Sequence, residues 1–462
     1  MTGNGAAARL SRDFRTAAAV RMVHLGLGSF FRAHQAWYTA SAPDGDHWGI
    51  AAFTGRGPAM AAALSAQDGL YTLVTRAAGG DEFEVVRTIS RVHAATDAQA
   101  WLRYFAAPEV AVVTLTVTEA GYTRRGDGSL DLGNPAVAAD LTAVRADPGA
   151  VGTTAAARLV AGLAARRAAG VGPLAVVPCD NLPGNGAVLA HIIGEFAALA
   201  APDLRGWIDD NVSFVTSAVD RITPATTPED IAAVGQALGY RDDVPVVTEP
   251  FREWVLAGEF PAGRPRWEDA GAVFTADLTP YEHRKLWLLN GAHSLLAYTA
   301  PLRGHLTVGQ AMADPVCRGW VTQWWAEAVP HLRQPDQELT EYTRALLTRF
   351  ANPRMQHRLS QIAQDGSQKL PVRILPVLRR ERAAGRMPAG AVRALAGWVC
   401  HLTGNGVPVS DDRARPVSGA GAALGLLDGT LTDDRELCRA VEAQARQLRA
   451  AVDHRAGSLP PS

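Results

Sequence analysis

The sequence predicts an α/β protein with a Rossmann-type domain over residues 20–275, followed by a mostly α-helical domain over residues 276–455. In the first part, short β-branched runs alternate with helical stretches, the pattern of a parallel sheet covered by helices. In the second part, long amphipathic segments follow one another and such β-rich runs disappear. A chain of 462 residues is long enough for two such domains, each with its own core.

The elements can be placed from the same patterns. The expected strands are short and apolar, and they cover 22–27, 49–53, 110–117, 174–178 and 212–218. The helices expected in the first domain cover 31–42, 155–169 and 187–200. Those expected in the second domain are amphipathic, and they cover 281–298, 319–328, 338–350, 371–382, 390–402 and 433–452.

Composition excludes several functional classes. A formal net charge of −1 gives no general electrostatic reason to bind nucleic acid or an anionic membrane. No apolar run approaches the roughly 20 residues that a membrane span requires, and the first 19 residues carry no signal-peptide pattern. The cysteines are far apart and form no CxxC pair, which suits a reducing cytoplasm: Cys179, Cys317, Cys400 and Cys438.

A dinucleotide site is expected after the first strand. Gly26 and Gly28 form a GxG there, before a predicted helix, and glycines let the backbone approach a pyrophosphate closely. The match is partial, because Phe31 stands where a third glycine would be. A purely structural glycine turn is the alternative.

The second strand does not decide between NAD and NADP. NAD binding usually uses an acidic residue at the end of this strand, and residues 51–57 contain none. Arg56 could face a 2′-phosphate, or it could be a solvated turn residue.

Lysine usage points to the chemistry. The chain has 45 basic residues, and all but Lys285 and Lys369 are arginine. Arginine cannot release its proton in a protein, whereas the pKa of a desolvated lysine can fall toward neutrality. Lys285 precedes an apolar run, so it is a candidate proton-transfer group rather than a surface cation retained by chance.

On a regular α-helix, Lys285, Asn290 and His293 would share one face about 140° wide. The apolar residues between them predict a buried helix, and a buried lysine without a role is rare. Such a lysine can act as the base when a secondary alcohol is oxidised, and a carboxamide such as Asn290 can donate to the developing oxyanion. No cluster of metal ligands accompanies these residues, so we expect a metal-independent mechanism.

At these residues the chain resembles the polyol-specific long-chain dehydrogenase/reductase family, which includes mannitol 2-dehydrogenases and fructuronate reductases. The K-x4-N-x2-H pattern at Lys285 matches the family's catalytic motif. Further motifs match in the family's order, beginning at Gly26, Gln67, Thr118, Cys179, Val219, Glu249 and Asp365.

The resemblance implies a role for each matching residue. Lys285 would be the general base, Asn181 and Asn290 the oxyanion donors, and His293 would orient substrate hydroxyls. Asp220 and Lys369 would contact the polyol, and Asp180 would stabilise the loop that presents Asn181. NAD, or alternatively NADP, would be bound by Gly26, Gly28, Phe31, Arg32 and Arg56.

One departure bears on the substrate. Mannitol-type members carry arginine where this chain has Gln361, which is more similar to the uronate-reducing branch. Lys369 and Arg373 could still meet a carboxylate. The substrate therefore stays open between hexitol/ketohexose and hexonate/hexuronate pairs.

Two other functions compete with this interpretation: a sugar-phosphate dehydrogenase and a nucleotide-sensing protein without catalysis. The first would need an additional basic cluster in the helical domain, and Arg379, Arg380, Arg382 and Arg386 look like a solvated helix face. The second has no need for a titrating amine. We expect a monomer, because the apolar stripe of the last helix is narrow.

Overall fold

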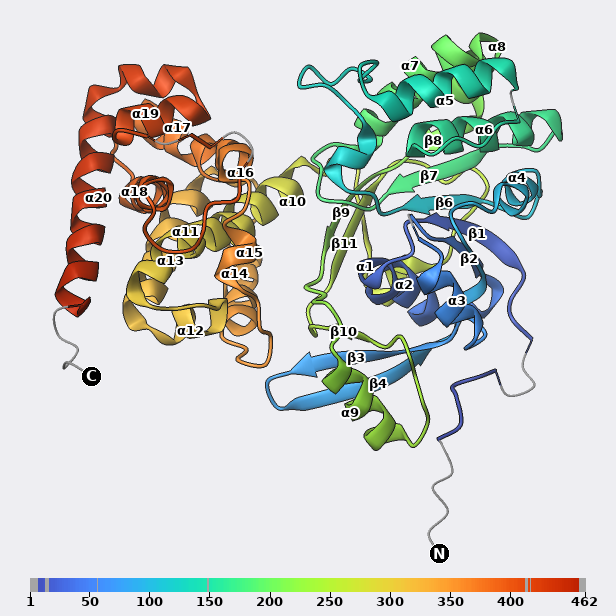
Figure 1. The fold of residues 1–462 in the computed structure, drawn as a ribbon, viewed down its shortest axis with the longest axis horizontal. Helices are drawn as coiled ribbons and strands as arrows, with labels where there is room; N and C mark the ends of the chain where they lie inside the picture. Colours follow the sequence, from blue (N-terminus) through green and yellow to red (C-terminus); the bar gives the residue numbers. More distant parts are fainter. Residues whose placement is uncertain are drawn as a thin grey trace, which may run out of the picture. The chain divides into compact units, whose positions relative to one another are not determined.

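The computed structural model describes residues 7–12, 16–55, 57–147, 149–411, 414–415 and 417–456, with side chains up to residue 450. The chain separates into two compact units, Met1–Leu278 and Thr279–Ser462, which we call unit 1 and unit 2 (Figure 1).

Unit 1 is built on a six-stranded parallel sheet in the order β5-β2-β1-β6-β7-β8. Its strands are β1 (Val20–Leu25), β2 (Gly49–Phe53), β5 (Ile89–His93), β6 (Val112–Leu115), β7 (Leu174–Pro178) and β8 (Val212–Phe214). The chain moves outward from β1 to β2 and β5, then returns to β6 on the other side. The strand order thus reverses between β1 and β6, where doubly wound folds bind ligands at the carboxyl ends of the strands.

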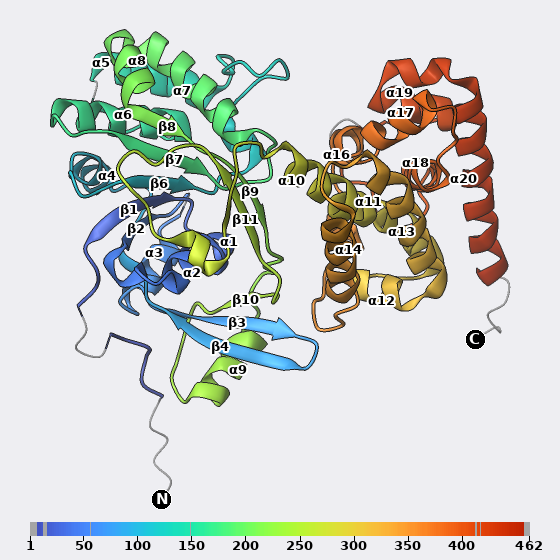
Figure 2. The same cartoon turned by 180° about the vertical axis from the view of Figure 1, so that it is seen from behind.

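Both faces of this sheet are buried. Val23 and Leu25 of β1 point into a core shared with α4 to α8, whereas Met22 points into a second core shared with α1 and α2. Figure 2 shows α5 to α8 at the top of unit 1, with α1 and α2 below β6. The first group of helices is α4 (Ala98–Phe105), α5 (Pro135–Ala146), α6 (Ala155–Ala168), α7 (Asn185–Ala200) and α8 (Pro202–Asn211). The predicted Rossmann-type fold of the first part is thereby confirmed.

Two smaller sheets complete unit 1, and the sequence did not lead us to expect them. One has the order β10-β3-β4 and the other β12-β11-β9, each with one antiparallel pair. Their strands are β3 (Tyr71–Ala77), β4 (Gly80–Val86), β9 (Thr216–Asp220), β10 (Val246–Thr248), β11 (Glu253–Ala257) and β12 (Val273–Phe274). Helices α3 (Ala59–Ser65) and α9 (Pro228–Leu238) lie in the same unit.

Two predicted elements of unit 1 are each divided. The helix expected over 31–42 is α1 (Ser29–Ala33) and α2 (Gln35–Ser41), which are separated by His34 at φ −120° and ψ −89°. The strand expected over 212–218 is β8 and β9, which belong to different sheets. The sequence did not reveal either break, because no glycine or proline marks it.

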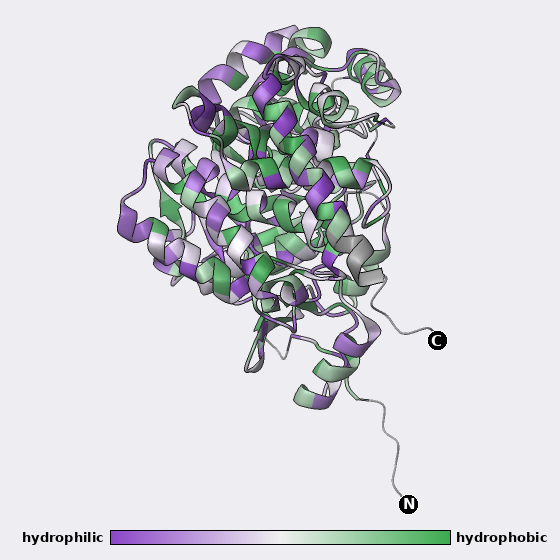
Figure 3. Ribbon diagram, turned by 90° about the vertical axis from the view of Figure 1, so that its left-hand side faces the viewer, coloured by the Kyte–Doolittle hydropathy of each residue, from purple (hydrophilic) through white to green (hydrophobic). Residues whose placement is uncertain are grey.

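Unit 2 is helical, as predicted. Its described residues form α10 (Thr279–Arg284), α11 (Gly291–Thr299), α12 (Val308–Ala313), α13 (Pro315–Ala328), α14 (Asp336–Phe350), α15 (Leu359–Ile362), α16 (Gly366–Arg373), α17 (Leu375–Ala383), α18 (Ala389–Leu402), α19 (Ala420–Leu427) and α20 (Arg435–Ala456). Hydrophilic and hydrophobic residues alternate along the helices that face the viewer in Figure 3, as expected for amphipathic helices around a core.

The helix expected over 281–298 contains an irregular turn. Residues Lys285–Asn290 form a π-helix between α10 and α11, and the N–H of Gly291 bonds to the carbonyl of Leu286, five residues earlier. The expectation of one regular α-helix, and of the angles between its side chains, is wrong here. Lys285 is also only half-buried, whereas Trp287, Leu288 and Leu289 are buried.

Among the described residues, no helix is both long and apolar enough to cross a membrane. All four cysteines lie in the described part of the chain and are free.

Candidate functional site

The glycine turn lies at the carboxyl end of β1, beside the end of β6. Gly26 has φ +107°, and a Cβ there would lie 2.2 Å from the carbonyl oxygen of Thr116. The position therefore requires glycine for its backbone conformation and for its close approach to the next strand. A Cβ at Gly28 would meet only the carbonyl of Gly26, at 3.6 Å. The protein itself leaves space over Gly28.

Phe31 and Arg32 are buried beneath this turn. The Phe31 ring stacks on His24 with centroids 3.5 Å apart, and Arg32 is 1% exposed. The Arg32 guanidinium donates to the carbonyls of Val244 at 2.5 Å and Gly28 at 3.3 Å, and burial lowers its pKa to about 10. The buried side chains of Phe31 and Arg32 therefore pack against the turn and stabilise its backbone. Arg56 lies outside the described residues.

Asn181 stands on the loop after β7, and a buried residue fixes that loop. The Asn185 side chain donates to the carbonyls of Pro178 and Ser217 and accepts from the N–H of Ser217 at 3.0 Å. The Ser217 hydroxyl also donates to the Pro178 carbonyl at 2.6 Å. The end of β7 is thus tied to the beginning of β9, and Asn181 is exposed at the carboxyl edge of the sheet.

Asp180 ties the same loop to the 3-10 turn Glu119–Tyr122, which follows β6. Its carboxylate accepts from the Tyr122 hydroxyl and from the N–H of Leu182. Burial raises the pKa of Asp180 and that of Tyr122. This agrees with the loop-stabilising role expected of Asp180. Glu119 is exposed on the 3-10 turn Glu119–Tyr122.

Asp220 ends β9 and is 5% exposed. The next residue, Arg221, donates to the carbonyl of Ala33 at 2.5 Å and to that of Glu249 at 3.2 Å. Arg221 therefore fixes the chain immediately after Asp220.

In unit 2 the π-helix changes the directions in which the side chains of Lys285 and Asn290 point relative to each other. In a π-helix the hydrogen-bonded partners are five residues apart, so Lys285 and Asn290 lie about one turn apart on the same side. On an α-helix with about 3.6 residues per turn, they would point in directions roughly 140° apart. Both side chains are half-buried at the edge of the unit 2 core.

His293 follows on α11 and is 6% exposed. Its ring stacks on Phe350 with centroids 4.7 Å apart and meets His357 edge-on at 5.0 Å. Burial, followed by His357 and the nearby arginines, lowers the pKa of His293 well below its usual value, so the ring is neutral. Its Nε2 finds no hydrogen-bond partner among the described residues.

The D-G-S-x-K motif is held rigidly at the start of α16. Asp365 adopts the left-handed conformation at φ 54°, and a Cβ on Gly366 would lie 2.4 Å from the Tyr298 hydroxyl. The Ser367 hydroxyl donates to Asp411 at 2.6 Å. Lys369 is thereby fixed one turn along a short helix that packs against the π-helix and α11.

Arg373 stands at the end of α16 and reaches α11. Its guanidinium donates to the hydroxyl of Ser294, the neighbour of His293, at 3.3 Å. In unit 2, Lys285 and Asn290 on the π-helix, His293 on α11, and Lys369 and Arg373 on α16 therefore lie on helices that pack against one another. Gln361 is exposed on α15.

One group in unit 2 has metal-ligand chemistry. Donor atoms of His305, Asp314 and Cys317 all lie within 4.8 Å of one another. The Arg303 guanidinium donates to the Asp314 carboxylate at 2.6 Å and lowers its pKa, and Asp314 also caps α13 through the N–H of Val316. A resident guanidinium disfavours a cation there, and the group functions as a helix cap.

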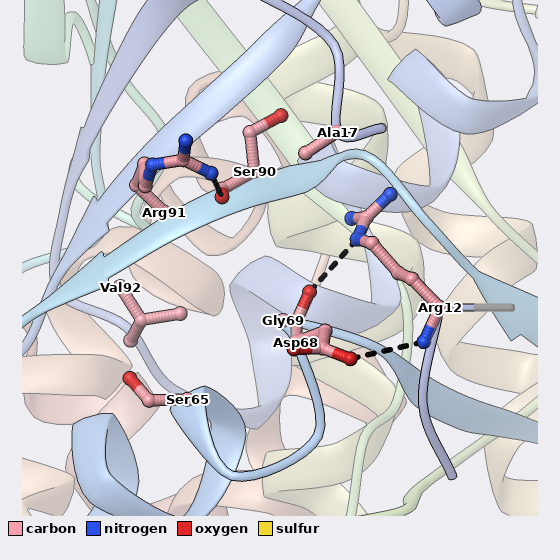
Figure 4. A pocket seen from close by; sticks show the side chains of 8 residues that line it. All are labelled: Arg12, Ala17, Ser65, Asp68, Gly69, Ser90, Arg91 and Val92. Carbon is pink, nitrogen blue, oxygen red and sulfur yellow. Dashed lines mark hydrogen bonds between the residues drawn. The ribbon is translucent and has the colours of Figure 1, made fainter. Parts of the chain in front are cut away.

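A cavity of about 430 Å³ lies at the β5 edge of unit 1 (Figure 4). Arg12 crosses it and donates to the carbonyls of Asp68, Arg87 and Ile89. The cavity lies at edge strand β5, away from the crevice between β1 and β6. We do not assign it to the active site.

The arginines of α17 are largely paired within unit 2. Arg379 pairs with Asp428, and Arg382 pairs with Asp434 and Glu436. Arg386, just beyond the helix, pairs with Glu381. The charges of these three arginines are thus balanced by carboxylates. Arg380 instead lies over the ring of Trp287, 4.8 Å from its centroid.

Sequence reasoning missed three supporting features: Asn185, His357 and the pair Trp324–Trp325. Asn185 lies inside a matched motif, so its buried side chain could have been inferred from its place beside Asn181. The consecutive tryptophans on an otherwise amphipathic helix are a further signal in the sequence. His357 has no local pattern around it.

Comparison with known proteins identifies the family. The chain matches the Mannitol dehydrogenase Rossmann domain over residues 20–269 and the Mannitol dehydrogenase C-terminal domain over residues 277–421. It is 38% identical to D-mannonate oxidoreductase of Escherichia coli over 395 residues, covering 83% of this chain and 80% of that one. It is 37% identical to mannitol 2-dehydrogenase of Cereibacter sphaeroides over 391 residues, covering 83% and 81%.

A solved structure agrees with these relatives. The ternary complex of Pseudomonas fluorescens mannitol 2-dehydrogenase with NAD and D-mannitol is 32% identical, with a TM-score of 0.80 over 98% of this chain and 97% of that one. The resemblance found from the motifs is confirmed: this chain belongs to the mannitol dehydrogenase family of oxidoreductases.

Proposed function

We propose that this protein reversibly oxidises a secondary alcohol of a linear sugar alcohol or aldonate to the ketose or keto-uronate, with NAD as the cofactor. The observation that carries the proposal is the arrangement in unit 2. Lys285 and Asn290 lie one π-turn apart, and the neutral ring of His293 follows with an unpartnered Nε2. This arrangement joins a titratable amine, a neutral amide donor and an open position for a hydroxyl.

The turn at Gly26 fits a dinucleotide. It lies where the strand order reverses, and the protein leaves the space over Gly28 open. Gly26 and Gly28 would hold the pyrophosphate through their main chain, above the support given by Phe31 and Arg32. A dinucleotide held there would supply the acceptor for the hydride that leaves the alcohol carbon. NADP remains an alternative, and Arg56 is the residue on which that choice would depend.

Lys285 would take the hydroxyl proton during oxidation and return it during reduction. Asn290, aligned with it, would donate to the alcohol oxygen as negative charge develops, and Asn181 would supply a second amide donor. A neutral His293 can accept a hydrogen bond at Nε2 from a neighbouring substrate hydroxyl.

The substrate would be held by groups from the remaining motifs. Asp220 would accept from hydroxyl groups, and Lys369 would donate to them. Arg373 and Lys369 lie on one helix and could together bind a terminal carboxylate, which favours an aldonate or uronate. The glutamine at 361 in place of an arginine supports the same branch.

The sugar-phosphate alternative has less support, because Arg379 and Arg382 of α17 are paired with carboxylates and Arg380 lies over the Trp287 ring. A nucleotide sensor without catalysis would not need an amine aligned with an amide in a π-helix.

A substrate panel tests the proposal. Ketohexoses and keto-uronates would be reduced with NADH and with NADPH, and the loss of reduced-nicotinamide absorbance followed. We expect turnover with NADH, and a higher kcat/KM for a keto-uronate than for its ketohexose counterpart. Arg373→Gln should reduce that preference while leaving the ketohexose rate nearly unchanged. Absence of turnover across the panel would contradict the proposed function, and an unchanged preference would contradict the role of Arg373.

A further inference from the structure

The π-helix at Lys285–Asn290 needs a physical cause, because an α-helix is the more common conformation for such a sequence. An extra residue in a helical turn leaves a main-chain carbonyl without its usual partner, and a buried carbonyl must find another donor. The cause should therefore be a donor from outside the helix.

Helix α13 supplies two donors. The indole N–H of Trp324 donates to the carbonyl of Trp287 at 2.7 Å, and that of Trp325 donates to the carbonyl of Leu288 at 2.8 Å. The rings are 0% and 5% exposed, so water does not compete for these bonds. Figure 1 shows α13 running beside α11, which continues from the π-helix.

Two further contacts fit the same arrangement. A Cβ on Gly291 would lie 2.7 Å from Nε1 of Trp324, so the first residue of α11 must be glycine for this indole to reach its carbonyl. Trp325 also packs on Phe350 at 6.3 Å, and Phe350 stacks on His293 at 4.7 Å. The tryptophan pair therefore contacts the π-helix backbone directly and His293 through one ring.

We propose that Trp324 and Trp325 are positioning residues: their indole N–H groups hold the π-helix open and so align Lys285 with Asn290. The inference rests on the proposed function of Lys285. Without the two bonds, the segment would relax toward an α-helix, and Lys285 and Asn290 would diverge. Misplacement by about 1 Å at a reacting centre can cost about 100-fold in rate.

The main test replaces both tryptophans by phenylalanine, which retains a ring and removes the N–H. For the Trp324→Phe/Trp325→Phe variant we expect kcat to fall about 10- to 100-fold, with cofactor affinity unchanged and the apparent pKa of the kcat–pH profile shifted. Hydrogen exchange of the amides in residues 286–291 should accelerate. Trp101→Phe is the matched control, because it removes a buried indole bond of 2.8 Å to the Arg158 carbonyl in unit 1.

A second variant keeps the proposal testable if the double variant does not fold. Gly291→Ala introduces the better helix former but displaces the Trp324 indole. We expect a folded protein with reduced kcat and a shifted pH profile. Full activity and an unchanged profile in Gly291→Ala or in the double variant would overturn the positioning role. Near-normal activity of Lys285→Arg would instead contradict the proposed function, while the exchange data would still report on the π-helix.

Discussion

The turn at Gly26 in unit 1 and the π-helix at Lys285–Asn290 in unit 2 are both irregular backbone segments, and they carry the residues proposed for cofactor binding and for catalysis. The first is encoded locally, because φ +107° and a 2.2 Å approach to Thr116 permit only glycine. The second is encoded by distant residues, since two indoles from α13 hold its carbonyls. A local irregularity is therefore visible in the sequence, whereas one imposed by packing is hidden.

The largest effect is expected for substitutions of Lys285, which should impair the chemical step assigned to unit 2 and leave cofactor binding by unit 1 intact. Lys285→Ala should lower kcat by about 10²–10⁴-fold or more, because a positioned base is lost. Lys285→Arg should be nearly as damaging, since a guanidinium does not release its proton. Steady-state rates and NADH binding would be measured together. Loss of NADH binding in these variants would contradict the separation of roles.

The next prediction concerns the glycine turn. Gly26→Ala should destabilise unit 1 by about 2 kcal/mol or more, because it combines a strained φ with a main-chain clash. Gly28→Ala is the matched control: it should leave stability nearly unchanged but weaken NADH binding, since its Cβ would enter the open space. Denaturant unfolding and NADH titration would distinguish the two. Equal loss of stability in both variants would show that Gly28 is also a structural glycine.

Acid should destabilise the fold around the unit 2 site. Burial lowers the pKa of His357 to about 4, and that of His293 also falls well below its usual value. The unfolded chain takes up these protons below about pH 6.5 and the folded chain does not, so the free energy of unfolding falls as pH drops from 6.5 toward 4. We expect a loss of roughly 1–3 kcal/mol between pH 7 and 4.5. Replacing His357 by glutamine should flatten this dependence in urea titrations, and an unchanged slope would argue against the effect.

Chelation should have no effect on turnover. The expected mechanism uses an amine rather than a metal, and the His305–Asp314–Cys317 group already contains the Arg303 guanidinium. Activity would be compared before and after treatment with a chelator, using a zinc enzyme as the positive control. Recovery of activity only upon adding Zn²⁺ would contradict this prediction.

Dilution should likewise leave specific activity constant. Along α20, the buried residues Leu437, Val441 and Leu448 form a narrow apolar stripe, and α20 packs on α18 and α19 of its own unit. An obligate dimer usually buries about 2,000 Å² or more of rather apolar surface, so we predict an active monomer. Light scattering and assays at nanomolar concentration would detect a dimer that dissociates with loss of activity.

Much of this protein was predictable from its residues. The β-branched runs predicted β2 and β7 with the same first and last residues as in the structure. The helical patterns predicted α6, α14 and α18 with ends within two residues of the observed ones. The β3–β4 hairpin was missed because β4 carries charged residues on its solvent-facing side, so its sequence lacks a strong strand pattern. The break at His34 was missed because no glycine or proline marks it in the sequence.

The sequence by itself determined the two-part architecture, the glycine turn and the identity of the motif residues, because these follow from local conformational preference and hydrophobic pattern. The scarcity of lysine is enough to make Lys285 and Lys369 conspicuous among the arginines. Only the tertiary structure decided that Lys285 and Asn290 lie on one side of their helix and that Nε2 of His293 is left open. The first feature depends on the indole donors of α13, and the second depends on the rings that α14 packs against His293. The spacing of side chains within one helix does not reveal hydrogen bonds donated by another helix.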